Sequence, residues 1–139
     1  TTGLLILTND GELSNILMHP SSDVEKKYVA KIEGTLSGEE LNKLKKGIVI
    51  DGRKCIPSRI KVKKRDKVKN TDIVEITISE GRNHIVKNIF DSLNHPVIKL
   101  TRTNYAFLNI DDLKSGDYRI LTHNEIRKLY SYKKIGKKK

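Results

Sequence analysis

The sequence predicts an α+β domain with a mainly antiparallel sheet. Short segments of alternating apolar and polar residues are joined by turns, which is typical of paired strands, and single amphipathic helices separate them. The 139 residues are enough for one domain with a core and too few for two. We expect that domain over residues 1–132 and a basic, disordered tail over 133–139. The expected order of elements is β-α-β-α-β-β-β-α-β-β-α.

The first elements are a strand, a helix and a second strand. The apolar run from Leu4 to Leu7 ends at a polar turn and predicts a buried strand. Helical spacing of Leu13, Ile16 and Leu17 predicts a short helix, which ends at His19 because the residue before a proline disfavours helical conformations. Residues 26–33 alternate, so Tyr28, Ala30 and Ile32 should face one side of a strand and Lys27, Val29 and Lys31 the other.

A capped helix and a hairpin follow. Ser37 and Glu40 have the spacing of a capping box, which predicts the start of a helix that ends at Gly47. A short strand over 48–50 is broken by the Asp51-Gly52 turn. Beyond it, two segments of alternating apolar and polar residues are joined by a polar turn, which predicts an antiparallel hairpin with one face in the core. The core-facing residues would be Ile60 and Val62 in the first strand and Val74, Ile76 and Ile78 in the second.

The apolar period changes to that of a helix at Arg82. Ile85, Val86, Ile89, Phe90 and Leu93 share one helical face. Strands are expected over 97–101 and 105–110. Thr122 and Glu125 form a second capping box, which predicts a last helix.

The charge of the chain favours an acidic polymer as its partner. There are 28 Lys and Arg against 17 Asp and Glu, a formal net charge of +11, with basic runs over 60–69 and 133–139. Such runs are either solvated surface or the source of non-specific attraction to phosphates. No run is long enough to predict a membrane span, and a single cysteine excludes a disulfide scaffold and a Cys-rich zinc site. The free Cys55 fits a cytoplasmic location.

Arg82 and Tyr28 are the candidates for chemistry. Arg82 lies between a strand and a helix, where it could hold a carboxylate in a bidentate pair or form a structural ion pair. Tyr28 is either a core residue or a ring at the edge of a cleft that stacks on a base. From the residues alone, the sequence predicts a basic RNA-binding domain.

Five blocks of the sequence together resemble the catalytic domain of bacterial ribosomal-RNA pseudouridine synthases of the RsuA/RluB type. In order along the chain they are TTGLLILTNDG, HP with KKYVAKIEG, LKKGIVIDG with Pro57, ITISEGRNHIVKNIF, and HPVIKLTR with LKSGDYRILTHNEIRKL. The resemblance implies an antiparallel mixed sheet flanked by helices with a central RNA-binding cleft. It also implies cofactor-free isomerisation of one uridine in ribosomal RNA, without a metal, by a monomer. No membrane partner is expected, because no apolar run is long enough to span one.

The resemblance also implies roles for single residues. Tyr28, in a K-x-Y motif, would pack against the target uracil, and Arg82, in E-G-R, would pair with the catalytic aspartate and hold it ionised. That aspartate would be the third residue upstream of Thr1, so this chain is expected to be an inactive fragment that also lacks a small S4-type RNA-binding module. Contacts with RNA are expected from Lys27, His84, Lys87 and Arg102.

Three positions depart from the family pattern. Ile85 replaces a glutamine, Asn88 an arginine and Ala106 a glycine. The first two departures leave an alternative open, in which the protein is a non-catalytic homologue that binds ribosomal RNA or assembling ribosomes. A weaker alternative is a general basic RNA-binding module.

Overall fold

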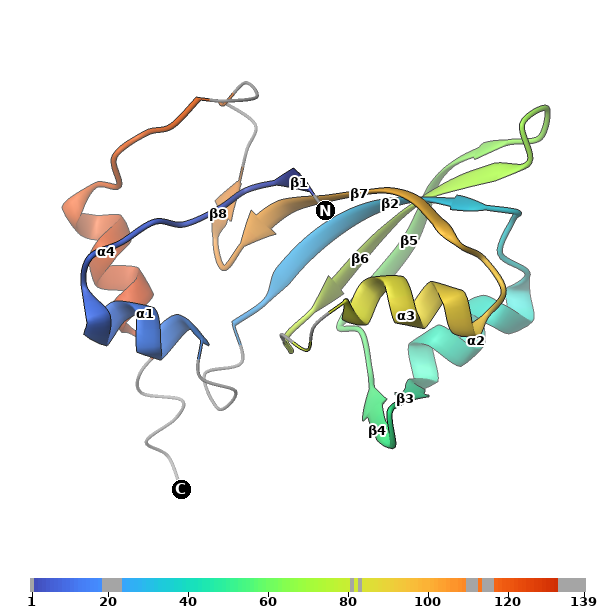
Figure 1. The fold of residues 1–139 in the computed structure, drawn as a ribbon, viewed down its shortest axis with the longest axis horizontal. Helices are drawn as coiled ribbons and strands as arrows, with labels where there is room; N and C mark the ends of the chain where they lie inside the picture. The colour runs from blue at the N-terminus through green and yellow to red at the C-terminus, as the bar shows by residue number, and fades with distance from the viewer. Residues whose placement is uncertain are drawn as a thin grey trace.

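A curved sheet runs through the molecule (Figure 1). The computed structural model describes residues 2–18, 24–80, 82, 84–109, 113 and 117–132. The strand order is β1-β7-β2-β6-β5, with β8 paired to β7, and every pair is antiparallel except the parallel pair β1–β7. The strands of this sheet are β1 (Thr2–Gly3), β2 (Lys26–Glu33), β5 (Arg59–Asp66), β6 (Thr71–Ile78), β7 (Val97–Tyr105) and β8 (Leu108–Asn109). The predicted α+β class with a mainly antiparallel sheet is confirmed.

The helices form two groups. Helices α2 (Gly38–Lys46) and α3 (Ile85–Ser92) cover one face of the sheet, whereas α1 (Gly11–Met18) and α4 (His123–Tyr130) pack together at the other end (Figure 1). Both predicted capping boxes are present, at the start of α2 and of α4. Within the described residues, no helix is long and apolar enough to cross a membrane.

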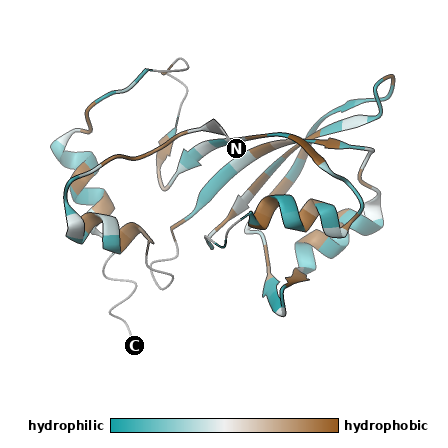
Figure 2. Ribbon diagram, viewed as in Figure 1, coloured by the Kyte–Doolittle hydropathy of each residue, from teal (hydrophilic) through white to brown (hydrophobic). Residues whose placement is uncertain are grey.

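The main core lies between the sheet and helices α2 and α3. The alternation predicted for β2 and for the β5–β6 hairpin directs one side chain in two into this core. A small hairpin, β3 (Ile48–Ile50) with β4 (Arg53–Cys55), packs against the same core. A second apolar cluster joins α1 and α4 to β8. Figure 2 shows hydrophobic and hydrophilic residues alternating along α3, as expected for a half-buried helix.

The predicted strand over Leu4–Leu7 is wrong. Strand β1 covers Thr2–Gly3, and Leu5 and Leu7 are 67% and 84% exposed. The backbone leaves β7 after the amide of Leu4 donates to the carbonyl of Arg102 at 2.8 Å. An apolar run forms a strand only where a neighbouring backbone pairs with it, and beyond Arg102 this edge of β7 pairs with β8 at Asn104 and Tyr105. Figure 2 shows the same segment as a hydrophobic stretch between β1 and α1.

Two other boundaries differ from the prediction, and β4 was not predicted. Helix α3 begins at Ile85 and not at Arg82, because His84 has a left-handed backbone with φ +55°. The strand expected over 105–110 is divided, since β7 runs to Tyr105 and Ala106, at φ +55°, turns the chain into β8. His19, Gly81, Ile110 and the tail over 133–139 lie outside the described residues.

Asp72 is a fully buried carboxylate at the start of β6. Its Oδ2 accepts a hydrogen bond from the amide of Leu36 at 3.0 Å and lies 3.9 Å from Nε of Arg65. Arg65 in turn donates from Nη2 to the carbonyl of Leu36 at 2.9 Å. The two side chains therefore satisfy both backbone groups of Leu36 where the chain enters α2.

His95 connects α2 to the end of β2. Its Nδ1 lies 2.7 Å from the carbonyl oxygen of Glu33, and its Nε2 lies 3.0 Å from the carboxylate of Glu40. Both partners are acceptors, so the geometry suits an imidazolium that donates from both nitrogens. Burial lowers the pKa of His95, but the hydrogen bonds to Glu40 and Glu33 raise it more, so the net pKa lies above 6.5.

This bridge makes the stability of the fold depend on pH. Because the pKa of His95 is higher in the folded chain, its contribution is complete below about pH 6.5 and is lost as the pH rises through the folded-state value. We expect the free energy of unfolding to fall by about 1 kcal/mol over that rise. Urea unfolding at a series of pH values measures it. His95→Gln should flatten the dependence, and an unchanged slope in that variant would contradict the assignment.

Candidate active site

Tyr28 lies at the centre of the sheet on the face that carries the main core. It pairs with Ile76 on β6 and with Arg102 on β7, and its side chain is half-buried at the edge of the core. The side chains of Ala30 and Ile32 point to the same side, as predicted from their alternation. The ring of Tyr28 is therefore fixed by a regular strand, and the neighbouring β7 places a guanidinium beside it.

Arg102 joins this position to the beginning of the chain. Its Nε and Nη2 donate to the carbonyl of Leu4 at 2.9 and 2.7 Å. Gly3 pairs with Arg102 in the sheet, and a Cβ on Gly3 would lie 2.2 Å from the carbonyl oxygen of Arg102. A residue with a side chain would push β1 away from β7. The first described residues therefore lie directly beside the strand neighbour of Tyr28.

Lys26 and Tyr105 extend the polar face beyond Tyr28. Lys26 is only 9% exposed, its Nζ lies 5.5 Å from the centre of the Tyr105 ring, and the guanidinium carbon of Arg102 lies 5.0 Å from the same ring. Burial, and then the charge of Arg102, lower the pKa of Lys26, whereas Glu80 raises it. Two cations against one aromatic ring make this end of the face attractive to an anion.

Arg82 lies past the end of β6 and is held by the protein itself. Its guanidinium donates to the carboxylate of Glu80 and to the carbonyl oxygens of Ile50 and Arg53 in the β3–β4 hairpin. Burial raises the pKa of Glu80, but the hydrogen bonds from Arg82 and Cys55 lower it more, so the net pKa lies below its usual value. From the sequence, Arg82 could form either a structural ion pair or a bidentate pair with a carboxylate. In the structure one contact is both, because two nitrogens of Arg82 donate to the two carboxylate oxygens of Glu80.

Cys55 lies beneath this ion pair. It is 2% exposed, and its thiol donates a hydrogen bond to Glu80. Burial, and then the neighbouring Glu80, raise the pKa of Cys55 to about 12. At neutral pH it is a neutral thiol that orients Glu80, and it is not a nucleophile.

The structure brings together only some of the residues expected in the site. Tyr28 and Arg102 are strand neighbours, and the charge of Glu80, the partner of Arg82, acts on Lys26 of the same face. His84 and Lys87 are exposed at the start of α3. Lys27 points to the opposite face of the sheet, where its Nζ lies 3.7 Å from Glu75. Lys27 and Tyr28 therefore cannot line one cleft.

Sequence reasoning did not single out Lys26, Glu80 and Tyr105. Lys26 precedes Tyr28 by two residues, so the alternation of β2 already placed the two on one face. The E-G-R motif contained Glu80 as well as Arg82. Nothing local indicated Tyr105, because its position depends on the pairing of β2 with β7, which includes a bulge between Lys27 and Tyr28.

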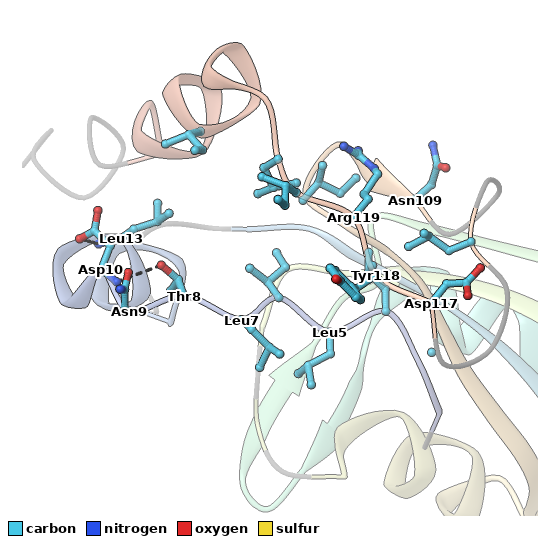
Figure 3. Close-up of a pocket in the computed structure, with 18 of the residues that line it drawn as sticks. Leu5, Leu7, Thr8, Asn9, Asp10, Leu13, Asn109, Asp117, Tyr118 and Arg119 are labelled. Atoms are coloured by element: carbon cyan, nitrogen blue, oxygen red, sulfur yellow. Dashed lines mark hydrogen bonds between the residues drawn. The ribbon is translucent and has the colours of Figure 1, made fainter.

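A larger cavity lies elsewhere. It has a volume of about 1010 Å³ between residues 3–10 and 117–121, and Figure 3 shows Leu5, Leu7, Tyr118 and Arg119 around it. Aliphatic side chains make up about half of its lining, beside charged residues that include Asp10, Lys99, Asp117 and Arg119. Neither Tyr28 nor Arg82, the two residues to which the sequence motifs point, lines it. We therefore place the candidate active site on the sheet, at Tyr28, Arg102, Lys26 and the Glu80–Arg82 pair.

The three departures from the family pattern have different structural settings. Ile85 is buried in the main core, so an apolar residue fits its position, and Asn88 is half-buried on the same helix. Ala106 has a left-handed backbone, in which glycine is unstrained and alanine is not.

Comparisons with known proteins agree with this fold. The family model described as RNA pseudouridylate synthase matches residues 1–92. A crystal structure of a pseudouridylate synthase superposes with a TM-score of 0.77 at 35% identity, covering 93% of this chain and 55% of that one. The chain belongs to the RNA pseudouridylate synthase family.

Within this family, the chain is similar to ribosomal large subunit pseudouridine synthase B of Bacillus subtilis. The two are 47% identical over 137 residues, which cover 99% of this chain and 56% of the relative. An uncharacterized RNA pseudouridine synthase of Aquifex aeolicus is 38% identical, with 94% and 51% covered. The chain therefore spans about half the length of these relatives. The Cbf5 complex with Nop10 and Gar1, at 16% identity and a TM-score of 0.56, supports the fold alone.

Proposed function

We propose that this chain forms most of the catalytic domain of a cytoplasmic, monomeric enzyme that converts a uridine of large-subunit ribosomal RNA to pseudouridine. The observation that carries the proposal is the polar face around Tyr28, in a chain 47% identical to a large-subunit pseudouridine synthase. In this isomerisation the bond from N1 of uracil to C1′ breaks and a bond from C5 to C1′ forms. The proton lost from C5 is balanced by the one gained at N1, so no cofactor is consumed.

Tyr28 is proposed to pack against the uracil of the flipped-out nucleotide. A half-buried ring on a regular strand has a fixed position, and an aromatic face suits a base that has left its stack. Arg102 and Lys26 lie on the same face and can neutralise the phosphates of that nucleotide. His84 and Lys87, exposed at the start of α3, are proposed as further RNA contacts.

The catalytic aspartate is proposed to lie upstream of this chain, three residues before Thr1. The proximity of β1 to Arg102 supports this, because a residue close to Thr2 can reach the same end of the sheet. Arg82 is proposed to hold that carboxylate ionised, since a nearby cation lowers the pKa of an aspartate. Glu80 then positions the guanidinium, and the β3–β4 carbonyls fix its plane.

A non-catalytic homologue that binds ribosomal RNA is the second candidate. The half-buried Asn88, where the family pattern has an arginine, favours it. The residue three positions before Thr1 in the natural gene separates the two functions. An aspartate supports the enzyme, and any other residue supports the binding protein.

Mapping pseudouridine in ribosomal RNA tests the proposal in the cell. We expect a strain without the gene to lose at least one carbodiimide-dependent stop in primer extension along large-subunit RNA, and a plasmid with the full-length gene to restore it. Small-subunit RNA from the same strain is the matched control. An unchanged pattern in large-subunit RNA would contradict the enzymatic function.

A further inference from the structure

The face of the sheet opposite Tyr28 carries most of its side-chain charge. Helices α2 and α3 lie on the Tyr28 side, and Figure 1 shows no helix of the described residues over the other side of β5, β6, β2 and β7. We call this other side the open face. Its cations come from β2, β5 and β7. They are Lys27, Lys31, Arg59, Lys61, Lys63, Lys64 and Lys99.

The strand register arranges these cations in rows. Lys64, Ile73, Lys31 and Lys99 are successive partners across β5, β6, β2 and β7. With strands about 4.8 Å apart, this row spans about 14 Å. Lys31 and Lys99 are direct partners, and like charges in that arrangement oppose each other. An anion lying across the row would remove this repulsion.

A polar cavity lies at one end of the open face. It has a volume of about 280 Å³ and is lined by Lys27, Arg59, Ser58, Thr77, Asn104, Ala106 and one carboxylate, that of Glu25. A guanidinium, an ammonium, a hydroxyl and an amide are donors that suit a phosphate group. The cavity and the lysine row therefore offer the same chemistry at two ends of one surface.

Carboxylates on this face do not neutralise it. Glu75 lies at the centre and is shared by Lys27 and Lys63, at 3.7 and 3.8 Å. Glu33 lies at the far end of β2, Asp66 lies at the same end on β5, where the charge of Lys64 acts on it, and Glu25 lines the polar cavity. Exposed Lys61, Lys64 and Lys99 stand in no ion pair with these groups among the described residues.

Protection of the sheet edge does not explain this pattern. Lysines on an edge strand commonly prevent pairing with another chain, which would account for the lysines of β5. Lys27 and Lys31 lie on β2, which pairs with β6 on one side and with β7 on the other. Their charge serves the face and not the edge, whereas Lys99 lies on a part of β7 that pairs with β2 alone among the described residues.

We propose that the open face binds duplex RNA through its phosphates, separately from the face that carries Tyr28. None of the residues of β5, β6, β2 and β7 that point to this side is aromatic, whereas single-stranded RNA is usually held by stacking on aromatic rings. The contact is sequence-independent, and its strength falls with salt concentration. It does not depend on catalysis, so it can be tested even if the proposed reaction is wrong.

The test compares two triple variants of the chain with equal changes in charge. Lys61, Lys64 and Lys99 are changed to alanine on the open face, and exposed Lys43, Lys45 and Lys46 of α2 are changed to alanine on the opposite side. Binding of a fluorescently labelled RNA duplex of arbitrary sequence is measured by anisotropy at several salt concentrations. We expect the open-face variant to bind about tenfold or more weakly, with a salt slope lower by about two to three, and the α2 variant to bind almost normally.

Two outcomes would overturn the proposal. If both triple variants lost affinity equally, the attraction would come from net charge and not from the open face. If the open-face variant bound the duplex normally but lost binding to polyglutamate, the surface would fit an acidic protein. Circular dichroism and thermal melting of both variants verify that they are folded.

Discussion

Arg82→Ala in the full-length protein is expected to lower pseudouridine formation about 100- to 1,000-fold. The variant removes the guanidinium proposed to keep the catalytic aspartate ionised and aimed at the sugar. Because the effect falls on the reacting carboxylate, kcat should fall while KM for the RNA changes little. Single-turnover conversion of transcribed large-subunit RNA measures it.

Arg82 also binds the backbone of the β3–β4 hairpin, so its structural role needs separate controls. Arg82→Lys keeps a charge but not the planar fork and should recover only part of the rate. Arg127→Ala removes an exposed arginine from α4 and should leave both rate and melting temperature unchanged. A lower melting temperature for Arg82→Ala with a normal kcat would show that the residue is only structural.

Asp72→Ala is expected to destabilise the domain by about 2–3 kcal/mol. The variant leaves the buried amide of Leu36 without its acceptor and removes the carboxylate beside Arg65. Asp72→Asn keeps an acceptor for Leu36 and should cost less. Urea unfolding followed by circular dichroism gives the free energies.

Asp91 provides the matched control for this prediction. It is an exposed aspartate on α3, and Asp91→Ala should change the free energy of unfolding by less than about 0.5 kcal/mol. If Asp72→Ala unfolded at the same urea concentration as Asp91→Ala, the contact with Leu36 would have no net value.

The elements with local causes were predictable from the sequence. Ser37 and Thr122 begin helices because their side chains, together with a glutamate three residues later, satisfy free backbone amides. This motif can be recognised from four consecutive residues of the sequence. The alternation of β2 likewise follows from one segment. The strand expected at Leu4–Leu7 failed because strand formation also needs a partner, and the segment leaves β7 after Leu4.

The candidate site was predictable only in part, for the same reason. Tyr28 and Arg82 were found through motifs, but the pairing of Tyr28 with Arg102 depends on a register between strands more than seventy residues apart in sequence. The alternation of β2 indicated that Lys27 and Tyr28 face opposite sides, so an RNA contact made by Lys27 would lie on the face opposite Tyr28. Whether Lys27, His84, Lys87 and Arg102 contact RNA stays a prediction.

The buried thiol of Cys55 allows local unfolding of the chain to be measured by chemical labelling. Only a thiolate reacts quickly with maleimides or peroxides, and this sulfur is both shielded and protonated at neutral pH. Alkylation must therefore wait until the β3–β4 hairpin moves away from the main core. Since this chain has a single cysteine, its labelling rate reports how often that local opening occurs, with no engineered probe.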